Sequence, residues 1–350
     1  MSIGHKVGFV GVLPISLKEM WRKKALRFGL KRERIDSIDE HVILFPSIPK
    51  LPYLNQLIHN FLGKHLLRKY FKMRGKPDIL HLHVYAAGDI ACWAQKHWNV
   101  PLVWTEHYSD AALNKLNDFE KTIVKKLCKR ASVRIAVSSS LAAQLQSQYG
   151  KSFECIPNTY DSRKFSCSTA EPKDSFFFIN VARIDRIKNH ERLILAFAKE
   201  FKGNPMVRLK IIGGGDISDL QELVIKNNLS GRVLFLGEQK AEQIVREYKC
   251  SHAFVLSSDY ETFCVSLIEA LACGLPAVST RCGGPEEILT SEELGVLVER
   301  DSDALATGMR YVFLNRSKYN RGEISRQIFE RYSLEVVADK LTNLYQLCIG

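Results

Sequence analysis

The sequence lacks paired cysteines and any hydrophobic run long enough to cross a membrane. Its nine cysteines are scattered over 350 residues, none forms a C-x-x-C pair, and their number is odd. This pattern argues against a zinc site and a disulfide framework and favours reduced thiols in a cytoplasmic protein. The apolar stretch Val7–Ile15 is too short for a span, and four cations follow it by residue 24. We therefore expect neither a signal peptide nor a membrane span.

No internal repeat, low-complexity tract or recognised nucleic-acid-binding module is evident, so we expect no nucleic-acid partner. The net charge of +12 is unevenly distributed along the chain. Residues 1–170 hold 27 Lys and Arg against 13 Asp and Glu, whereas the remaining residues hold 23 against 25. The basic first half suits an anionic partner, such as an anionic lipid surface or a phosphorylated substrate.

Short apolar runs alternate with segments of helical periodicity along nearly the whole chain. The predicted strands are Val7–Leu13, His41–Phe45, Asp78–His83, Pro101–Thr105, Val133–Ser138, Phe176–Ala182, Val207–Gly213, Val233–Gly237, His252–Ser257, Pro276–Thr280 and Gly295–Val298. Many are continuously apolar, which indicates strands buried on both faces. Alternation of such strands with helices predicts parallel sheets covered by helices, and two sets of strands predict two α/β domains.

The length also suits two domains, and a polar stretch without periodicity, Thr159–Ser175, predicts the linker between them. We expect a basic N-terminal domain over residues 1–165 and a second domain over residues 174–325. Residues 326–350 are expected to form a C-terminal helix that packs back toward the N-terminal domain.

Apolar residues recur at helical spacing in Leu51–Phe71, and cations crowd the C-terminal end of this segment. An ordinary surface helix would pack this apolar face on a sheet, and its cations would suit the helix C-terminus. An interfacial helix in contact with anionic membrane lipid would show the same pattern. The sequence leaves both interpretations open.

The segment Ala253–Ile288 predicts a strand, a loop and then a helix that ends at Gly274. The loop delivers the backbone N–H groups of Phe263, Cys264 and Val265 to the start of that helix. A helix N-terminus favours an anion, so a diphosphate would suit this position.

Two carboxylates accompany this loop, Glu261 just before the helix and Glu269 eight residues later. Carboxylates repel a phosphate, so beside an anion site they make sense as acceptors for the hydroxyls of a sugar or ribose. The alternative is a solvated Glu261 and a Glu269 on the helix surface.

The loop Asn180–His190 follows the first strand of the second domain, where α/β folds bind ligands. Arg183 and Lys188 in this loop would neutralise a leaving diphosphate without a metal, although a basic loop is often only solvated. The run IIGGGD, which contains Gly214, also follows a strand but lacks the third glycine of a dinucleotide fingerprint. Bare glycines there would let a ligand or a helix approach the backbone.

In the first half, Glu106 and His107 directly follow a predicted strand, and His81 and His83 lie on or beside another. Histidines at strand ends could serve chemistry, but a single histidine is more often structural. The Asp-Ser-Asp sequence at residues 301–303 imitates a metal-binding motif but precedes an apolar helix, so we expect a helix N-cap. We predict no metal.

Taken together, these segments resemble the retaining glycosyltransferases of family 4, which have the GT-B fold of two facing Rossmann-like domains. ETFCVSLIEALACGLPAVSTRCGGPEEI is similar to the family's E-x7-E region, VARIDRIKNH to its diphosphate loop and IIGGGD to its glycine turn. CIPNTYDSRKF is similar to the stretch between the domains, and PDILHLH, PLVWTEHYSD and AVSSSL have counterparts in the first domain. The likeness covers about residues 76–350.

The resemblance implies a metal-independent hexosyltransferase that moves a sugar from a nucleotide-diphosphate sugar to a glycan or lipid-linked acceptor, with retention. Such an enzyme would act in envelope polysaccharide or glycolipid synthesis at the cytoplasmic membrane face. The implied roles are: Arg183 and Lys188 on the leaving diphosphate; Gly214, Phe263, Cys264 and Val265 around the phosphates; Glu269 on the ribose; Glu261 on the transferred sugar; and His107 on the sugar and acceptor side.

Two features depart from the family. Cys264 stands where Gly or Pro is common, and GHKVGFVGV resembles the family's second strand, so the first βα unit of the N-terminal domain is expected to be absent. Another GT-B enzyme, such as a nucleotide-sugar epimerase, or a nucleotide-sugar-binding protein with weakened catalysis are the alternative functions.

Overall fold

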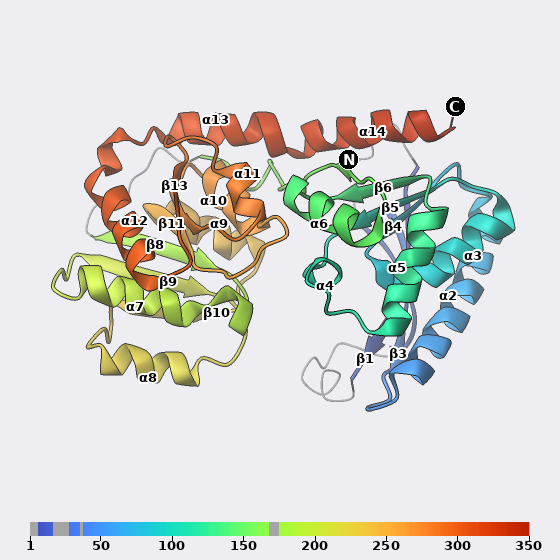
Figure 1. The fold of residues 1–350 in the computed structure, drawn as a ribbon, viewed down its shortest axis with the longest axis horizontal. Helices are drawn as coiled ribbons and strands as arrows, with labels where there is room; N and C mark the ends of the chain where they lie inside the picture. Colours follow the sequence, from blue (N-terminus) through green and yellow to red (C-terminus); the bar gives the residue numbers. More distant parts are fainter. Residues whose placement is uncertain (1–5, 17–27, 36–37, 168–174, 350) are drawn as a thin grey trace. The chain divides into compact units, whose positions relative to one another are not determined.

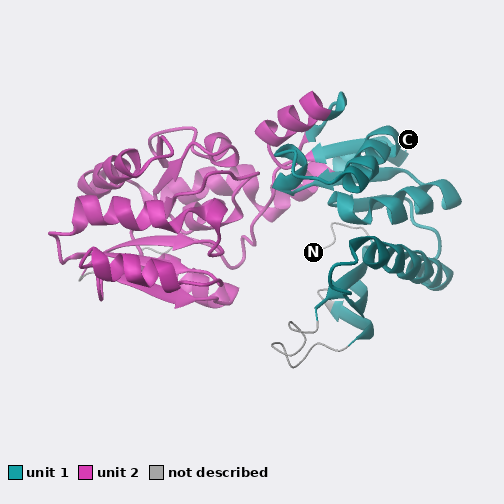
Figure 2. Ribbon diagram, turned by 60° about the horizontal axis from the view of Figure 1, so that its bottom comes forward, with its two compact units in different colours: residues 1–135, 149–154, 342–350 teal, residues 136–148, 155–341 magenta. Residues whose placement is uncertain are grey.

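The structure is a computed structural model that describes residues 6–16, 28–35, 38–167 and 175–349. Contacts divide the chain into two compact units (Figure 2). The first unit holds residues 1–135, 149–154 and 342–350, and the second holds residues 136–148 and 155–341. Both units combine helices with predominantly parallel sheets (Figure 1). The α/β class predicted from the sequence is therefore confirmed.

The contact-based units differ from the predicted domains in one segment. Helix α6 (Ser139–Tyr149) has most of its residues in the second unit, whereas the sequence places it in the first domain. The last helix, α14 (Leu334–Ile349), begins in the second unit and ends in the first. Residues 168–174 of the predicted linker lie outside the described residues, and the predicted domain boundaries stay a prediction.

The second unit contains a parallel six-stranded sheet with the order β10-β9-β8-β11-β12-β13. Its strands are β8 (Phe176–Val181), β9 (Val207–Ile212), β10 (Val233–Gly237), β11 (Ala253–Leu256), β12 (Ala277–Thr280) and β13 (Gly295–Val298). The strand order reverses between β8 and β11. In open α/β sheets, ligands bind outside the carboxyl ends of the strands at such a switch point.

Burial explains why these short segments form the centre of the sheet. All residues of β11 and β12 are buried, as expected for strands covered on both faces. The core clusters residues of β8, β9 and β11 with those of α7 and α12. Besides α6 and the first part of α14, the helices of this unit are α7 (His190–Phe201), α8 (Ser218–Lys226), α9 (Ala241–Lys249), α10 (Val265–Ala272), α11 (Gly284–Ile288), α12 (Ser302–Leu314) and α13 (Arg321–Tyr332).

The first unit contains a three-stranded sheet, β1-β3-β2, and most of a four-stranded sheet, β4-β5-β6-β7. Its strands are β1 (Gly8–Ile15), β2 (Gly29–Ile35), β3 (Ile38–Pro46), β4 (Leu80–His83), β5 (Leu102–Glu106) and, divided between the two units, β6 (Val133–Ala136) and β7 (Glu154–Cys155). Its helices are α2 (Pro52–Arg74), α3 (Gly88–Trp98), α4 (Ser109–Ala112) and α5 (Asp118–Arg130).

All eleven predicted strands are present, with ends that differ by three residues or fewer. Two further strands, β2 and β7, were not predicted. Strand β2 has the sequence GLKRERI and pairs antiparallel with β3, so this sheet is mixed rather than parallel. Its charged residues give neither the continuous apolar run nor the alternation that marks a buried strand. Only pairing with β3 identifies it.

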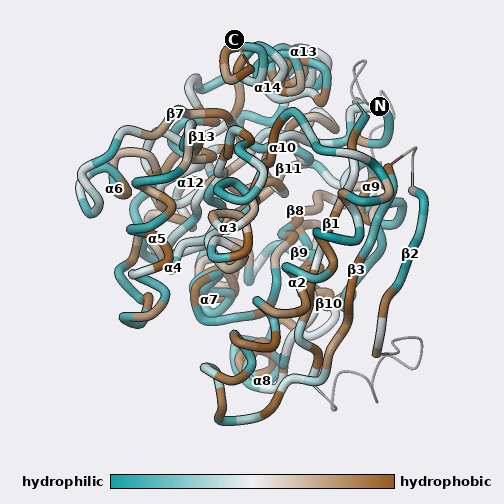
Figure 3. The backbone as a smooth tube through the Cα atoms, turned by 90° about the vertical axis from the view of Figure 1, so that its right-hand side faces the viewer, coloured by the Kyte–Doolittle hydropathy of each residue, from teal (hydrophilic) through white to brown (hydrophobic). Residues whose placement is uncertain are grey.

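The predicted amphipathic helix forms as α2. Its second half buries Leu66, Leu67 and Phe71 against strands β1 and β3 and helix α3. Figure 3 shows hydrophilic and hydrophobic segments alternating along α2 and hydrophobic ones along β8 and β11. Among the described residues, none of the helices combines the length and apolar content required to cross a bilayer.

Candidate functional site

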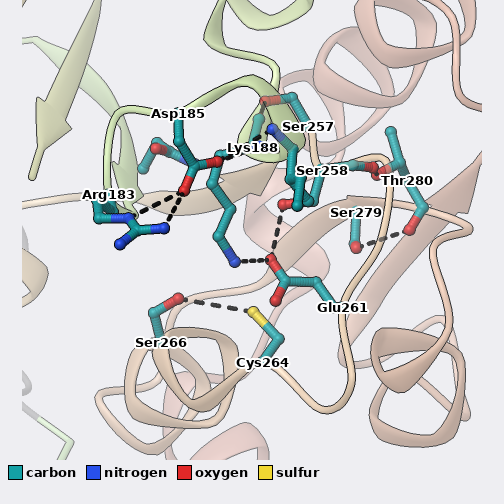
Figure 4. Close-up of polar contacts among 12 residues, drawn as sticks. Arg183, Asp185, Lys188, Ser257, Ser258, Glu261, Cys264, Ser266, Ser279 and Thr280 are labelled. Carbon is teal, nitrogen blue, oxygen red and sulfur yellow. Dashed lines mark hydrogen bonds and ion pairs between the residues drawn. The ribbon is translucent and has the colours of Figure 1, made fainter. Parts of the chain in front are cut away.

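Two loops at the switch point of the second unit are joined by an ion pair. Lys188 ends a short 3-10 helix (Arg186–Lys188) after β8, and Glu261 lies in the loop after β11. The Nζ of Lys188 donates to Oε1 of Glu261 over 2.7 Å (Figure 4). The hydroxyl of Ser258 donates to the same oxygen, also over 2.7 Å. The pair is mostly buried, with 24% of the Lys188 side chain and 9% of the Glu261 side chain exposed.

The charge state of Lys188 is fixed by its partner. Burial alone would lower the pKa of Lys188, but the carboxylate of Glu261 more than offsets it and raises that pKa above the ordinary value. Lys188 therefore carries its positive charge throughout the physiological pH range.

Arg183 lies in the same loop and stays largely in solvent. Its side chain is 79% exposed, and its guanidinium binds Oδ2 of Asp185 over 3.0 Å. The other oxygen of Asp185 accepts the backbone N–H groups of Ile187 and Lys188. Burial would raise the pKa of Asp185, but Arg183 and these amides lower it overall. Sequence reasoning missed Asp185, although an Asp just before a short helix is a recognisable N-cap.

Helix α10 begins beside the Lys188–Glu261 pair without a side-chain cap. Its N-cap residue is Cys264, with φ of 87° in the left-handed region, and among the described residues no side chain caps it. Figure 4 shows the Lys188 and Glu261 side chains beside the turn that carries Cys264 and Ser266. The predicted helix start at Phe263, Cys264 and Val265 is therefore in place. Its free N–H groups and helix dipole favour an anion.

Glycines beside the loops that carry Lys188 and Glu261 allow neighbouring backbone segments to pack closely against them. A Cβ on Gly213 would lie 1.9 Å from the carbonyl oxygen of Ala182, and one on Gly215 would lie 2.5 Å from that of Ile184. The glycine run after β9 thus supports the loop that carries Arg183. Gly214, the predicted ligand-binding residue of this run, accepts through its carbonyl from the Ile184 N–H.

Gly284 supports the loop that carries Glu261. The Glu261 N–H donates to the carbonyl of Cys282, and the Gly284 N–H donates to the carbonyl of Glu261. A Cβ on Gly284 would lie 2.3 Å from Cα of Phe263, so a larger residue would displace the turn before α10. The predicted E-x7-E region therefore acts in part by fixing the backbone of the loop that carries Glu261.

Glu269 lies about one turn into α10, half-buried and with no side-chain partner among residues 6–16, 28–35, 38–167 and 175–349. Burial raises its pKa to about 7. A half-buried carboxyl with unused acceptor oxygens is chemically suited to accept from hydroxyls, and the ribose contact of this residue stays a prediction.

His107 lies in the first unit, after β5. Its Nε2 is 3.0 Å from Nδ1 of His83, and the two rings stack. This pairing was not predicted, although parallel pairing of β4 with β5 brings their carboxyl ends together. His81 has a structural place: its ring nitrogens lie 2.5 Å from the Tyr345 hydroxyl and 2.7 Å from that of Thr105.

The loop that carries His107 is held by the fully buried Glu106. Its carboxyl accepts from the N–H groups of Tyr85, His107 and Tyr108 over 2.9–3.1 Å. Burial raises the pKa of Glu106 to about 7, and these three bonds oppose that rise.

The Asp-Ser-Asp sequence at residues 301–303 is a helix N-cap, as predicted. The Asp301 carboxylate accepts from the N–H groups of Asp303 and Ala304 at the start of α12. Among the residues that the structure describes, no group of three or more His, Cys, Asp or Glu side chains has an arrangement suited to a metal ion.

Replacing Lys188 with Ala should destabilise the second unit by about 2–4 kcal/mol, because it leaves the buried Glu261 carboxylate without its cation. Lys199→Ala is the matched control, since it breaks an exposed pair with Asp303 and should cost less than about 1 kcal/mol. Urea denaturation of both variants tests this expectation. Equal losses would mean that burial of the Lys188 pair has no energetic consequence.

Glu269→Gln should change stability in a pH-dependent way. Because burial raises the folded-state pKa of Glu269 to about 7, its favourable contribution is complete below about pH 4.5 and is lost as pH rises through 7. Between pH 5 and 8 the free energy of unfolding of the variant should therefore rise relative to that of the parent, by roughly 1–3 kcal/mol at the upper end. Melting temperatures of both proteins across this range measure the difference, and parallel curves would contradict the assignment.

Comparison with known proteins supports the same reading of both units. Residues 161–327 match the family model described as Glycosyl transferases group 1, and residues 13–164 match that of Glycosyltransferase Family 4. An uncharacterized glycosyltransferase of Methanocaldococcus jannaschii, MJ1059, is 38% identical over 148 residues. That match covers 39% of this chain and 36% of the relative, so the chain spans about a third of its length.

Solved structures show the fold over nearly the full length. Sucrose-phosphate synthase from Thermosynechococcus elongatus matches with a TM-score of 0.79 at 18% identity, covering 97% of this chain and 98% of that one. Anabaena Alr3699/HepE in complex with UDP and glucose matches with a TM-score of 0.73 at 19% identity, covering 89% and 86%. The two family models together span residues 13–327, and the chain belongs to the group 1 glycosyltransferases of family 4, with the GT-B fold.

Proposed function

We propose that the protein is a retaining, metal-independent hexosyltransferase that takes its sugar from a nucleotide-diphosphate donor. One observation carries the proposal. The cationic loop with Arg183 and Lys188 and the uncapped start of α10 lie at the carboxyl ends of adjacent strands, β8 and β11. Positive charge and free N–H groups at a topological switch point favour a diphosphate.

The diphosphate would lie between the two loops. Arg183, exposed and held by Asp185, supplies one charge, and the permanently charged Lys188 supplies the other. The N–H groups of Phe263, Cys264 and Val265 would donate to phosphate oxygens, and Gly214 would border them without a side chain. The open carboxyl of Glu269 would accept from the ribose hydroxyls.

Glu261 would accept from hydroxyls of the transferred sugar while keeping Lys188 in place. In the reaction, the bond between the anomeric carbon and the phosphate oxygen breaks, and its electron pair stays on the diphosphate. The acceptor oxygen bonds to the same carbon from the same face, and its proton passes to the departing phosphate oxygen. The two cations stabilise the negative charge that develops there.

His107 would line the sugar and acceptor side, with His83 bound to its Nε2 and Glu106 fixing its loop. In this role His107 contacts the sugar, whereas Glu106 and His83 act only by positioning it. Family resemblance supports this assignment, together with the ordered loop after β5.

The acceptor would be a glycan or a lipid-linked molecule, and the enzyme would serve envelope polysaccharide or glycolipid synthesis. We propose that it works in the cytoplasm, attached peripherally to the inner face of the cell membrane. The support is the excess of Lys and Arg in residues 1–170, which suits an anionic surface.

Donor binding should stabilise the protein by mass action, by about 2.7 kcal/mol when the ligand is at a hundred times its dissociation constant. A thermal-shift panel of UDP- and GDP-sugars identifies the nucleotide, and UDP is the first candidate because HepE binds it. Arg183→Ala should abolish most of the shift, whereas Arg208→Ala, an exposed control on β9, should keep it. A full shift in Arg183→Ala would sink the phosphate assignment.

Turnover distinguishes the proposal from its alternatives. With a glycan or lipid-linked acceptor, the parent should release nucleoside diphosphate and form a glycoside with the donor's anomeric configuration. The His107→Ala substitution should lower kcat by a larger factor than it lowers the affinity for the donor. An isomerised donor formed without acceptor would indicate an epimerase instead. A donor-induced thermal shift without any turnover would indicate a binding protein.

A further inference from the structure

A second basic site lies in the first unit, between helices α2, α3 and α5. It is a cavity of about 340 Å³. Its lining residues are Asn60, Lys64, Asp89, Cys92, Trp93, Lys96, Lys126 and Arg130. Figure 1 shows α2, α3 and α5 side by side in this unit. The cavity belongs to none of the motifs assigned to donor binding.

The cavity has an excess of positive charge around an aromatic wall. Four cations and one acid, Asp89, line it. The Oδ1 of Asp89 already pairs with the Nζ of Lys126 over 2.6 Å. Within the described part of the chain, Lys64, Lys96 and Arg130 have no acidic partner. Unpaired cations that converge on one cavity favour an anionic group such as a phosphate.

Trp93 contacts Lys64 and one further cation, Arg68, beside this cavity. The Nζ of Lys64 lies 5.8 Å from the centre of the Trp93 ring, and the guanidinium of Arg68 lies 4.7 Å from it. Such cation–π contacts hold long side chains in place while leaving their donors available. Two cations of α2 therefore pack against the aromatic ring at this side of the cavity.

The same face of α2 is apolar in its first half and exposed there. Tyr53, Leu57 and Phe61 follow one another at spacings of four residues, with 66%, 48% and 72% of their surface exposed. Lys64 and Arg68 continue this stripe at spacings of three and four residues. Phe119 of α5 packs edge-on against Tyr53 at 6.3 Å and is itself 39% exposed, so the apolar surface extends onto α5.

We infer that this face binds an anionic phospholipid bilayer, with a lipid phosphate in the cavity and the apolar stripe among the acyl chains. A free phosphate would account for the cations but not for three large apolar side chains beside them. A lipid supplies both chemistries in one molecule, with charge at the headgroup and hydrocarbon next to it. The inference rests on the membrane attachment proposed above and specifies its surface and its ligand.

Vesicle co-sedimentation of the full chain tests this assignment. The vesicles are phosphatidylcholine with and without phosphatidylglycerol. The cavity variant is Lys96→Glu with Arg130→Glu, and the apolar variant is Leu57→Ser with Phe61→Ser. Lys226→Glu with Lys318→Glu, two exposed cations of the second unit, is the charge-matched control.

The parent and the control should bind the anionic vesicles. The cavity variant and the apolar variant should each bind them more weakly, by about tenfold or more. Soluble glycerol 3-phosphate at the lipid concentration should not release the parent. Donor-induced thermal shifts should be the same in all four proteins, which separates this test from that of sugar transfer and checks that the variants fold.

Four results would overturn the inference. Failure of the parent to bind anionic vesicles removes membrane attachment altogether. Equal binding of the cavity variant and the control leaves attachment standing but removes the cavity from it. Release by glycerol 3-phosphate, or equal binding to phosphatidylcholine alone, contradicts joint recognition of the phosphate and the hydrocarbon.

Discussion

The ion pair between Lys188 and Glu261 joins two loops that lie 73 residues apart in the sequence. Its two charges stabilise each other in a mostly buried place, where either one alone would be costly. Removing Lys188 would therefore affect both the charge of the loop after β8 and the position of Glu261. Cation and carboxylate are best understood as one pair that fixes the geometry of the loops after β8 and β11.

The two loops also require close packing of backbone against backbone. Gly213 and Gly215 admit the loop after β8, and Gly284 admits the turn before α10. None of these glycines needs to touch a ligand to be necessary for binding one. Asp185 has a similar effect, because its carboxylate fixes the backbone amides of Ile187 and Lys188 in the loop after β8.

Much of this arrangement follows from local sequence. Continuous apolar runs predicted the buried strands, and the spacing of loop residues behind them predicted the positions of Arg183, Lys188 and Glu261. Parts that depend on pairing did not follow. The antiparallel β2 is recognisable only beside β3, and the contact of His83 with His107 only once β4 pairs with β5. Long-range contacts decide these features, and no window of the sequence contains them.

Glu269 shows how binding and stability oppose each other in this unit. A carboxyl held half-buried without a partner acquires a pKa of about 7, so the folded protein without ligand keeps an unfavourable charge above that pH. A hydroxyl donor would stabilise the carboxylate and lower its pKa again. In the proposed role of Glu269, the same burial that weakens the ligand-free fold would strengthen the binding of a hydroxyl-bearing ligand. Lys188 differs because its counter-charge is built into the chain, so it keeps its positive charge at any physiological pH.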